Sequence, residues 1–376
     1  MKQKIFMLIM LSILIFQTIP VSVGAVESVS ARNAILMEQH TGRVLYEKKA
    51  HEPERIASIT KIMTAILAIE SGKLREKVKV SNRASGTEGS SLYLKVGEEM
   101  LLEDLVYGLM LRSGNDAAVA IAEHVGGSLE GFVFLMNQKA LELGMANTRF
   151  ANPHGLDDHE DHYSTAYDMA LLTKYAINNE KYKEIAGTKV HRAPNPNESW
   201  DYVWRNKNRL LTDLYRHATG GKTGYTKRAK RTLVTTAAKG DFEMIAVTLN
   251  GPDDWNDHIH MFETGFAEYD IVEVLPEGGI KSIVDPHYKD RVYLEHAIIY
   301  PLTAEEQKLV NVEYKLLKPQ RDGEVREIVG KAVVYVGNNK IKEVPIFYRH
   351  SVDEKKSFYD YFKNIFTSVI GLRADG

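Results

Sequence analysis

Three short motifs stand in one order along the chain, and together they hold the residue types of a serine acylation site. They are Ser58-Ile59-Thr60-Lys61, Ser113-Gly114-Asn115 and Lys222-Thr223-Gly224. Each is short enough to arise by chance in a chain of 376 residues, so their joint order is more informative than any one of them. The set is typical of enzymes in which a serine opens an amide and forms an acyl-enzyme.

The first motif pairs a hydroxyl with an amine. Residues 59–69 have the apolar periodicity of a helix, so we expect Ser58 at the helix start and Lys61 on the same face. Serine is a weak nucleophile that needs a base, and lysine is a base only when burial and nearby cations lower its pKa. Lys222 is a suitable cation. An isolated motif of this kind would more often be a helix cap with a solvated lysine.

The second motif falls in a break between two apolar helical segments, residues 102–111 and 117–125. A break of this kind can direct two short polar side chains into a cleft. Ser113 could then relay a proton to the leaving amine, and the Asn115 amide could hold the substrate backbone. A simple connecting turn is the alternative interpretation.

The third motif offers a cation, a hydroxyl and a position without a side chain at a predicted strand edge. Lys222 and Thr223 suit a substrate carboxylate, and Gly224 allows the substrate to approach the backbone closely. The N–H groups of Tyr225 and Ser58 could together form an oxyanion hole. By itself the motif could also be an ordinary start of a strand.

The surrounding pattern predicts an α+β fold with a mostly antiparallel sheet, because strands are predicted at both ends of the first 275 residues and helices between them. The predicted strands are residues 32–37, 43–47, 232–238 and 243–249, and the predicted helices are residues 59–69, 102–111, 117–125, 132–143 and 167–176. A turn-rich stretch beginning at Pro276 marks a domain boundary. Residues 276–350 alternate polar and apolar residues and predict a small all-β domain, with strands at 291–294, 310–316, 332–336 and 344–348.

Both ends of the chain have patterns of their own. Residues 1–25 have the charged start, apolar stretch and small-residue cleavage site of a secretory signal peptide, with an uncleaved anchor as the alternative. The catalytic domain is therefore expected over residues 26–275, outside the cytoplasm. Residues 351–376 form an amphipathic pattern rich in aromatic residues, which predicts a helix on a membrane surface or, alternatively, one that packs on its own domain.

Composition excludes several classes of function. The net charge of −2 gives no indication of a nucleic-acid partner. The chain has no cysteine, so disulfides, thiolate catalysis and cysteine-ligated zinc are absent, and we expect no cofactor. A metal-dependent peptidase is an alternative because residues 154–162 are rich in His, Asp and Glu and His258-Ile259-His260 adds more. The spacing fits a zinc site poorly and predicts a solvated loop, in which His154 alone could face the cleft.

The sequence around the motifs resembles the low-molecular-mass penicillin-binding proteins, the serine-type D-alanyl-D-alanine carboxypeptidases. The resemblance rests on residues 55–64, 111–117 and 152–156, covers about residues 30–270, and continues more weakly to the end. It is strongest to the sporulation-type carboxypeptidase of endospore-forming bacteria. The family implies a β-lactamase/transpeptidase-like catalytic fold followed by a small β-sandwich domain.

The resemblance also implies roles for the site residues. Ser58 would be the acylated nucleophile, Lys61 its base and Ser113 the proton relay. The substrate would be held by Asn115, Lys222, Thr223, Gly224 and Tyr225. The implied reaction removes the terminal D-alanine from peptidoglycan pentapeptide stems at the outer face of the membrane, in spore cortex maturation, and β-lactam antibiotics would acylate the same serine.

Two rival functions share these motifs. A serine β-lactamase normally also has a Glu-x-x-Leu-Asn loop, which this sequence lacks. A penicillin sensor that stays acylated, or a peptidoglycan-binding scaffold, would need no fast release of the acyl group. One departure from the family concerns specificity: Ala229-Lys230-Arg231 stands where many relatives have Ala-Gly.

Overall fold

The computed structural model describes residues 29–318 and 327–349, and the chain divides into two compact units at residue 268. The predicted signal peptide and the predicted amphipathic segment 351–376 lie outside the described residues. Each unit has a hydrophobic core of its own.

The first unit is built on a five-stranded antiparallel sheet with the strand order β2-β1-β9-β8-β7. The predicted hairpin near the N-terminus is present, as are the two predicted strands after residue 230. Lys222-Thr223-Gly224 lies inside the edge strand β7, a strand that none of the predicted ranges covers. The strands are β1 (Asn33–Glu38), β2 (Val44–Lys48), β7 (Ala218–Thr226), β8 (Lys230–Lys239) and β9 (Phe242–Leu249).

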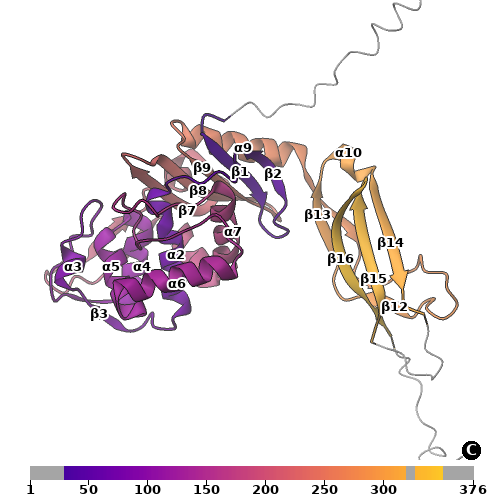
Figure 1. The fold of residues 1–376 in the computed structure, drawn as a ribbon, viewed down its shortest axis with the longest axis horizontal. Helices are drawn as coiled ribbons and strands as arrows, with labels where there is room; N and C mark the ends of the chain where they lie inside the picture. The colour runs from indigo at the N-terminus through magenta and orange to yellow at the C-terminus, as the bar shows by residue number, and fades with distance from the viewer. Residues whose placement is uncertain (1–28, 319–326, 350–376) are drawn as a thin grey trace, which may run out of the picture. The chain divides into compact units, whose positions relative to one another are not determined.

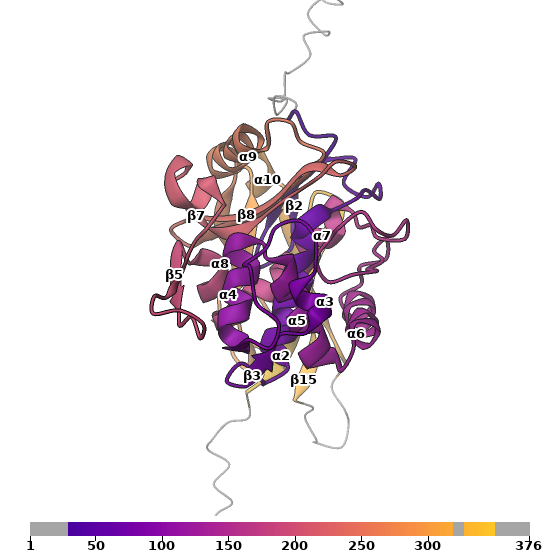
Figure 2. The ribbon, with the colours of Figure 1, turned by 90° about the vertical axis from the view of Figure 1, so that its left-hand side faces the viewer.

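Helices cover both faces of this sheet. Helix α9 (Asp254–Glu268) packs on one face and α7 (Ala166–Ile177) on the other (Figures 1 and 2). Strand β7 forms one edge of the sheet. An antiparallel sheet covered by helices confirms the predicted α+β class. The remaining elements of the first unit are η1 (Ala57–Thr60), α2 (Lys61–Glu70), β3 (Lys77–Lys79), α3 (Asn82–Ser85), β4 (Glu99–Leu101), α4 (Leu102–Arg112), α5 (Asn115–Gly126), α6 (Leu129–Glu142), α8 (Glu180–Gly187), β5 (Val190–Ala193), β6 (Tyr202–Arg205) and the turn η2 (Leu210–Leu214).

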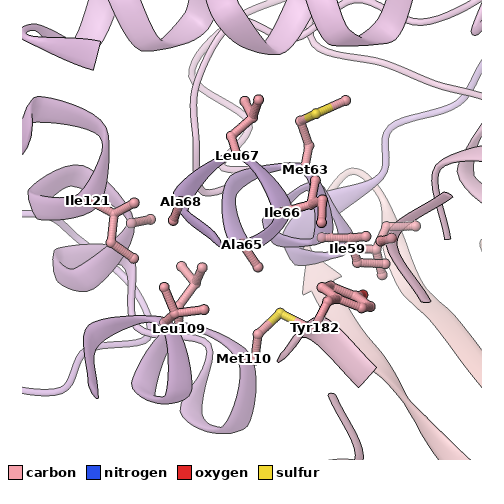
Figure 3. Packing of buried hydrophobic residues seen from close by; sticks show 14 of the residues in the cluster. Ile59, Met63, Ala65, Ile66, Leu67, Ala68, Leu109, Met110, Ile121 and Tyr182 are labelled. Atoms are coloured by element: carbon pink, nitrogen blue, oxygen red, sulfur yellow. The ribbon is translucent and has the colours of Figure 1, made fainter. Parts of the chain in front are cut away.

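Helix α2 lies at the centre of the first core. All of its residues except Glu70 are buried. Figure 3 shows Ala65 and Ala68 of α2 on the side that faces Leu109 of α4 and Ile121 of α5. A fully buried aliphatic side chain stabilises a fold by about 1.5–3 kcal/mol, so this packing holds α2 rigidly. The first residue of the helix, Lys61, is fixed with it.

The second unit consists mainly of strands, in one five-stranded and one two-stranded antiparallel sheet. It begins at Tyr269, before the predicted start at residue 276, because β10 pairs with β13 of the same unit. Its core includes Val292, Ala332 and Ile346. Its elements are β10 (Asp270–Leu275), β11 (Gly278–Gly279), β12 (Val292–Leu294), β13 (Ile298–Leu302), α10 (Ala304–Gln307), β14 (Val310–Leu316), β15 (Ile328–Val336) and β16 (Asn339–Tyr348).

Candidate active site

Ser58 and Lys61 meet where a short 3₁₀ turn leads into α2. Ser58 belongs to the turn η1 and Lys61 is the first residue of the α-helix. Lys61 Nζ lies 3.1 Å from Ser58 Oγ, within hydrogen-bond reach. Ala57 has a φ of 48°, in the left-handed region that a residue with a side chain seldom adopts. The chain therefore turns sharply just before Ser58.

The Lys61 amine is completely enclosed. Besides Ser58 Oγ, its Nζ contacts Asn115 Oδ1 at 2.7 Å and the carbonyl oxygen of His154 at 2.6 Å. Burial holds the pKa of Lys61 well below its usual range, and the charges of Lys222 and Lys207 lower it further. A neutral amine has two N–H donors and one lone pair. In its neutral form the Lys61 amine can donate to the two carbonyl-type oxygens and keep its lone pair for the Ser58 hydroxyl.

Ser113 and Lys222 form a second pair. Helix α4 ends at Arg112, and the capping residue Ser113 has a φ of 65° that reverses the chain before α5 begins at Asn115. The predicted break between the helices is therefore present. Lys222 Nζ donates to Ser113 Oγ at 3.1 Å and to the carbonyl oxygen of Thr223 at 2.8 Å. Burial lowers the pKa of Lys222 to about 7, and the charge of Lys207 adds to this effect. The Lys222 amine can therefore gain or lose a proton near neutral pH.

Strand β7 passes directly beside the serine. A Cβ atom added to Gly224 would lie 2.9 Å from Ser58 N and 2.4 Å from Thr232 Oγ1, so only glycine fits there. Tyr225, the next residue, has a side chain that is 64% exposed. The structure thus brings together all eight predicted residues: Ser58, Lys61, Ser113, Asn115, Lys222, Thr223, Gly224 and Tyr225.

Sequence reasoning missed two residues at this site. Lys207 donates to Ser90 Oγ at 3.3 Å, and its own pKa is lowered by burial and by Arg112. Asp116 is buried and accepts hydrogen bonds from Leu92 N at 2.9 Å and from Leu94 N at 3.2 Å, which shapes the loop over the second motif. Asp116 follows that motif directly, so its position was a usable signal. Lys207 had none in the sequence.

Comparison with known proteins agrees with this geometry. A family model described as D-alanyl-D-alanine carboxypeptidase matches residues 20–253. The chain belongs to this family. It is therefore a serine-type carboxypeptidase hydrolase of a class that acts on peptidoglycan and binds β-lactams.

Among curated relatives, the carboxypeptidase DacF of Bacillus subtilis is 41% identical over 249 residues, covering 64% of this chain and 63% of that protein. The match to DacF thus spans less than two thirds of its length. DacC of Escherichia coli is 34% identical over 356 residues, covering 87% of this chain and 85% of that protein.

The solved structures extend the likeness to both units. DacD of Francisella tularensis has a TM-score of 0.68 at 26% identity and covers 87% of this chain and 94% of that chain. Penicillin binding protein 5 of Haemophilus influenzae has a TM-score of 0.71 at 25% identity, over 86% of this chain and 97% of that chain.

The histidine- and acid-rich stretch of this carboxypeptidase family member forms a braced loop. The carbonyl group of His154 binds Lys61, and the pKa of its buried ring is lowered to about 3 by burial and by the charge of Lys61. His162 contacts Thr60 Oγ1 at 2.8 Å. Glu160 accepts hydrogen bonds from two arginines at 2.6–2.8 Å. Across residues 29–318 and 327–349, no group of three or more His, Asp or Glu side chains could hold a metal ion.

Helix lengths bear on membrane attachment. Within the described part of the chain, no single helix is long and apolar enough to cross a membrane. Helices α5 and α6 are long and apolar enough only when taken together, and they are bent by 84° relative to each other.

Proposed function

We propose that this chain removes the terminal D-alanine from peptidoglycan pentapeptide stems through an acyl-enzyme on Ser58. The observation that supports this most is the enclosed Lys61 amine 3.1 Å from Ser58 Oγ. The family matched by the chain is that of the D-alanyl-D-alanine carboxypeptidases. Both point to the same reaction.

Acylation begins with the substrate extended along the free edge of β7. Lys222 and Thr223 bind the terminal carboxylate, and the N–H groups of Ser58 and Tyr225 hold the oxygen of the scissile carbonyl. Lys61 takes the proton of Ser58 as the hydroxyl attacks the carbonyl carbon. The proton taken up by Lys61 passes through the Ser113 hydroxyl to the leaving nitrogen as the C–N bond breaks, so that free D-alanine departs and Lys61 is neutral again.

Deacylation returns the enzyme to its starting state. Water attacks the ester carbon while Lys61 accepts one of its protons, and Ser58 regains a proton as the ester bond breaks. Asn115 holds Lys61 through a 2.7 Å hydrogen bond and keeps the amine in place for both half-reactions. A β-lactam would follow the same acylation step, but its leaving group stays attached.

The deciding experiment measures D-alanine release from diacetyl-Lys-D-Ala-D-Ala by the chain without residues 1–25. We expect release that prior treatment with penicillin blocks, and neither release nor penicillin labelling for Ser58→Ala. Ser71→Ala, a change in a hydroxyl outside the site, serves as the matched control and should keep both. No release from protein that still binds penicillin covalently would favour a sensor, and rapid hydrolysis of penicillin would favour a β-lactamase.

We also propose where the enzyme acts, namely on which peptidoglycan and at which membrane. The resemblance to the sporulation-type branch supports a role in spore cortex peptidoglycan, on the outer face of the membrane of the developing spore. The amphipathic pattern of residues 351–376 supports attachment to the membrane surface. Removing the residues after Ser357 should abolish sedimentation with anionic lipid vesicles and leave D-alanine release intact. Continued sedimentation would contradict the attachment, and spores without the protein but with unchanged cortex stem peptides would contradict the setting.

A further inference from the structure

The hairpin that follows the third motif has a concentration of positive charge. Thr226 pairs with Lys230 across its end, so the tip consists of Lys227, Arg228 and Ala229. Arg231 comes next, and four of the five residues from 227 to 231 are therefore basic. This is also the place where the sequence departs from the Ala-Gly of many relatives.

Two of the four cations are already paired. Arg228 makes two hydrogen bonds to the Glu160 carboxylate, at 2.7 and 2.8 Å, and Arg231 binds Asp254 at 2.6 Å. Lys227 and Lys230 are exposed, and no described residue forms an ion pair with either of them. The Glu160–Arg228 pair fixes the hairpin tip and leaves these two ammonium groups available.

The backbone at Lys230 is strained. Its φ of 60° lies in the left-handed region, where glycine is free of strain and a lysine is not. Residues held in such conformations occur often at ligand-binding sites. A lysine at a position that favours glycine indicates that the side chain has a role, such as ligand binding, which offsets the backbone strain.

The direction of the substrate places the hairpin tip beside a particular part of it. In the proposed function the terminal carboxylate lies at Lys222 and Thr223, and the scissile carbonyl lies at Tyr225 N–H. The peptide therefore extends from Tyr225 toward Thr226 as it is followed toward its N-terminus, by about 3.3 Å per residue. The residue before D-Ala-D-Ala, the third of the stem, reaches the beginning of the hairpin.

We propose that Lys227 and Lys230 form a subsite for a free carboxylate on the third residue of the stem peptide, an inference that rests on the proposed function. The preferred substrate is then a stem whose third residue is an acidic diamino acid. A stem with a neutral acylated lysine at this position lacks the interaction.

Two peptides that differ by one carboxylate test this assignment. The first is diacetyl-Lys-D-Ala-D-Ala, and the second has diacetyl-meso-diaminopimelate in place of the diacetyl-lysine. We expect kcat/KM to be about two- to fivefold higher for the second peptide, mainly through KM, as is typical of exposed ion pairs. High salt should reduce this ratio because exposed charges are screened.

Variants separate the subsite from general charge effects. The double variant K227Q/K230Q should bring the ratio close to one, whereas K77Q/K79Q, which removes two exposed lysines from β3, should keep it. Lys230→Gly should lower the ratio and raise the melting temperature, since it removes both the charge and the strain. Equal kcat/KM values for the two peptides in the unaltered enzyme, or an unchanged ratio in K227Q/K230Q, would overturn the subsite. Failure to cleave either peptide would overturn the proposed function itself.

Discussion

A Cβ atom added to Gly155 would lie 1.9 Å from the carbonyl oxygen of Ala57. The loop that offers the His154 carbonyl to Lys61 thus packs directly on the residue before Ser58. Gly155 also has a φ of 85°, which a residue with a side chain adopts only under strain. This single glycine therefore connects the geometry of the base to the geometry of the nucleophile.

We expect Gly155→Ala to lower the free energy of unfolding by about 2–4 kcal/mol, because it combines left-handed strain with a backbone clash. It should also slow acylation by penicillin. Gly144→Ala is the matched control: φ is 72° and nothing lies within 4 Å of its added Cβ, so strain alone should cost about 1 kcal/mol. Urea unfolding measures both variants, and equal losses would contradict the close contact.

Lys61→Met tests the identity of the base. Methionine keeps much of the length of lysine and removes the amine, so the Ser58 hydroxyl loses its proton acceptor. We expect the rate of acylation by penicillin to fall by about 10²–10⁴-fold, the usual contribution of a general base. Circular dichroism checks the fold of the variant. An acylation rate within a factor of a few of the unaltered enzyme would show that another group removes the proton.

Asp116→Asn tests the buried carboxylate next to the second motif. One amide oxygen cannot replace the two carboxylate oxygens that accept from Leu92 N and Ser91 Oγ. We expect a loss of about 1.5–3 kcal/mol in the free energy of unfolding, as for other charge-assisted hydrogen bonds. Since the Asp116 charge raises the pKa of Lys61, the variant should also shift the acidic limb of the activity profile to lower pH. Unchanged stability would contradict the role of Asp116 in shaping the loop.

Local patterns were sufficient to predict much of the fold and the three motifs. The hairpin β1–β2, the helices on either side of Ser113, and strands β8 and β9 all have clear apolar periodicity. Strand β7 does not, because its sequence is rich in glycine and threonine, and no strand was therefore predicted over residues 218–226. Its small residues reflect the close approach of Ser58, which only the folded chain reveals.

The contributions of Lys207 and Gly155 could not be predicted either, because they depend on residues that come close to them only in the folded chain. Lys207 lowers the pKa of Lys61 and Lys222, which are far from it in sequence. Gly155 is fitted to Ala57, again a distant residue. Neither residue has a local pattern that differs from an ordinary lysine or a turn glycine. The boundary of the second unit was misplaced likewise, because only the pairing of β10 with β13 assigns β10 to it.

Lys207→Gln tests how the cations set the working pH. The profile of kcat/KM should rise on the acidic side as Lys61 loses its proton, and fall on the alkaline side near pH 7 as Lys222 loses the proton that binds the substrate carboxylate. Lys207 lowers the pKa of both lysines, so removing its charge should raise both values and move both limbs to higher pH. Lys77→Gln, an exposed change on β3, should leave the limbs in place. A shift of either limb of the Lys207→Gln profile to lower pH would contradict this electrostatic coupling.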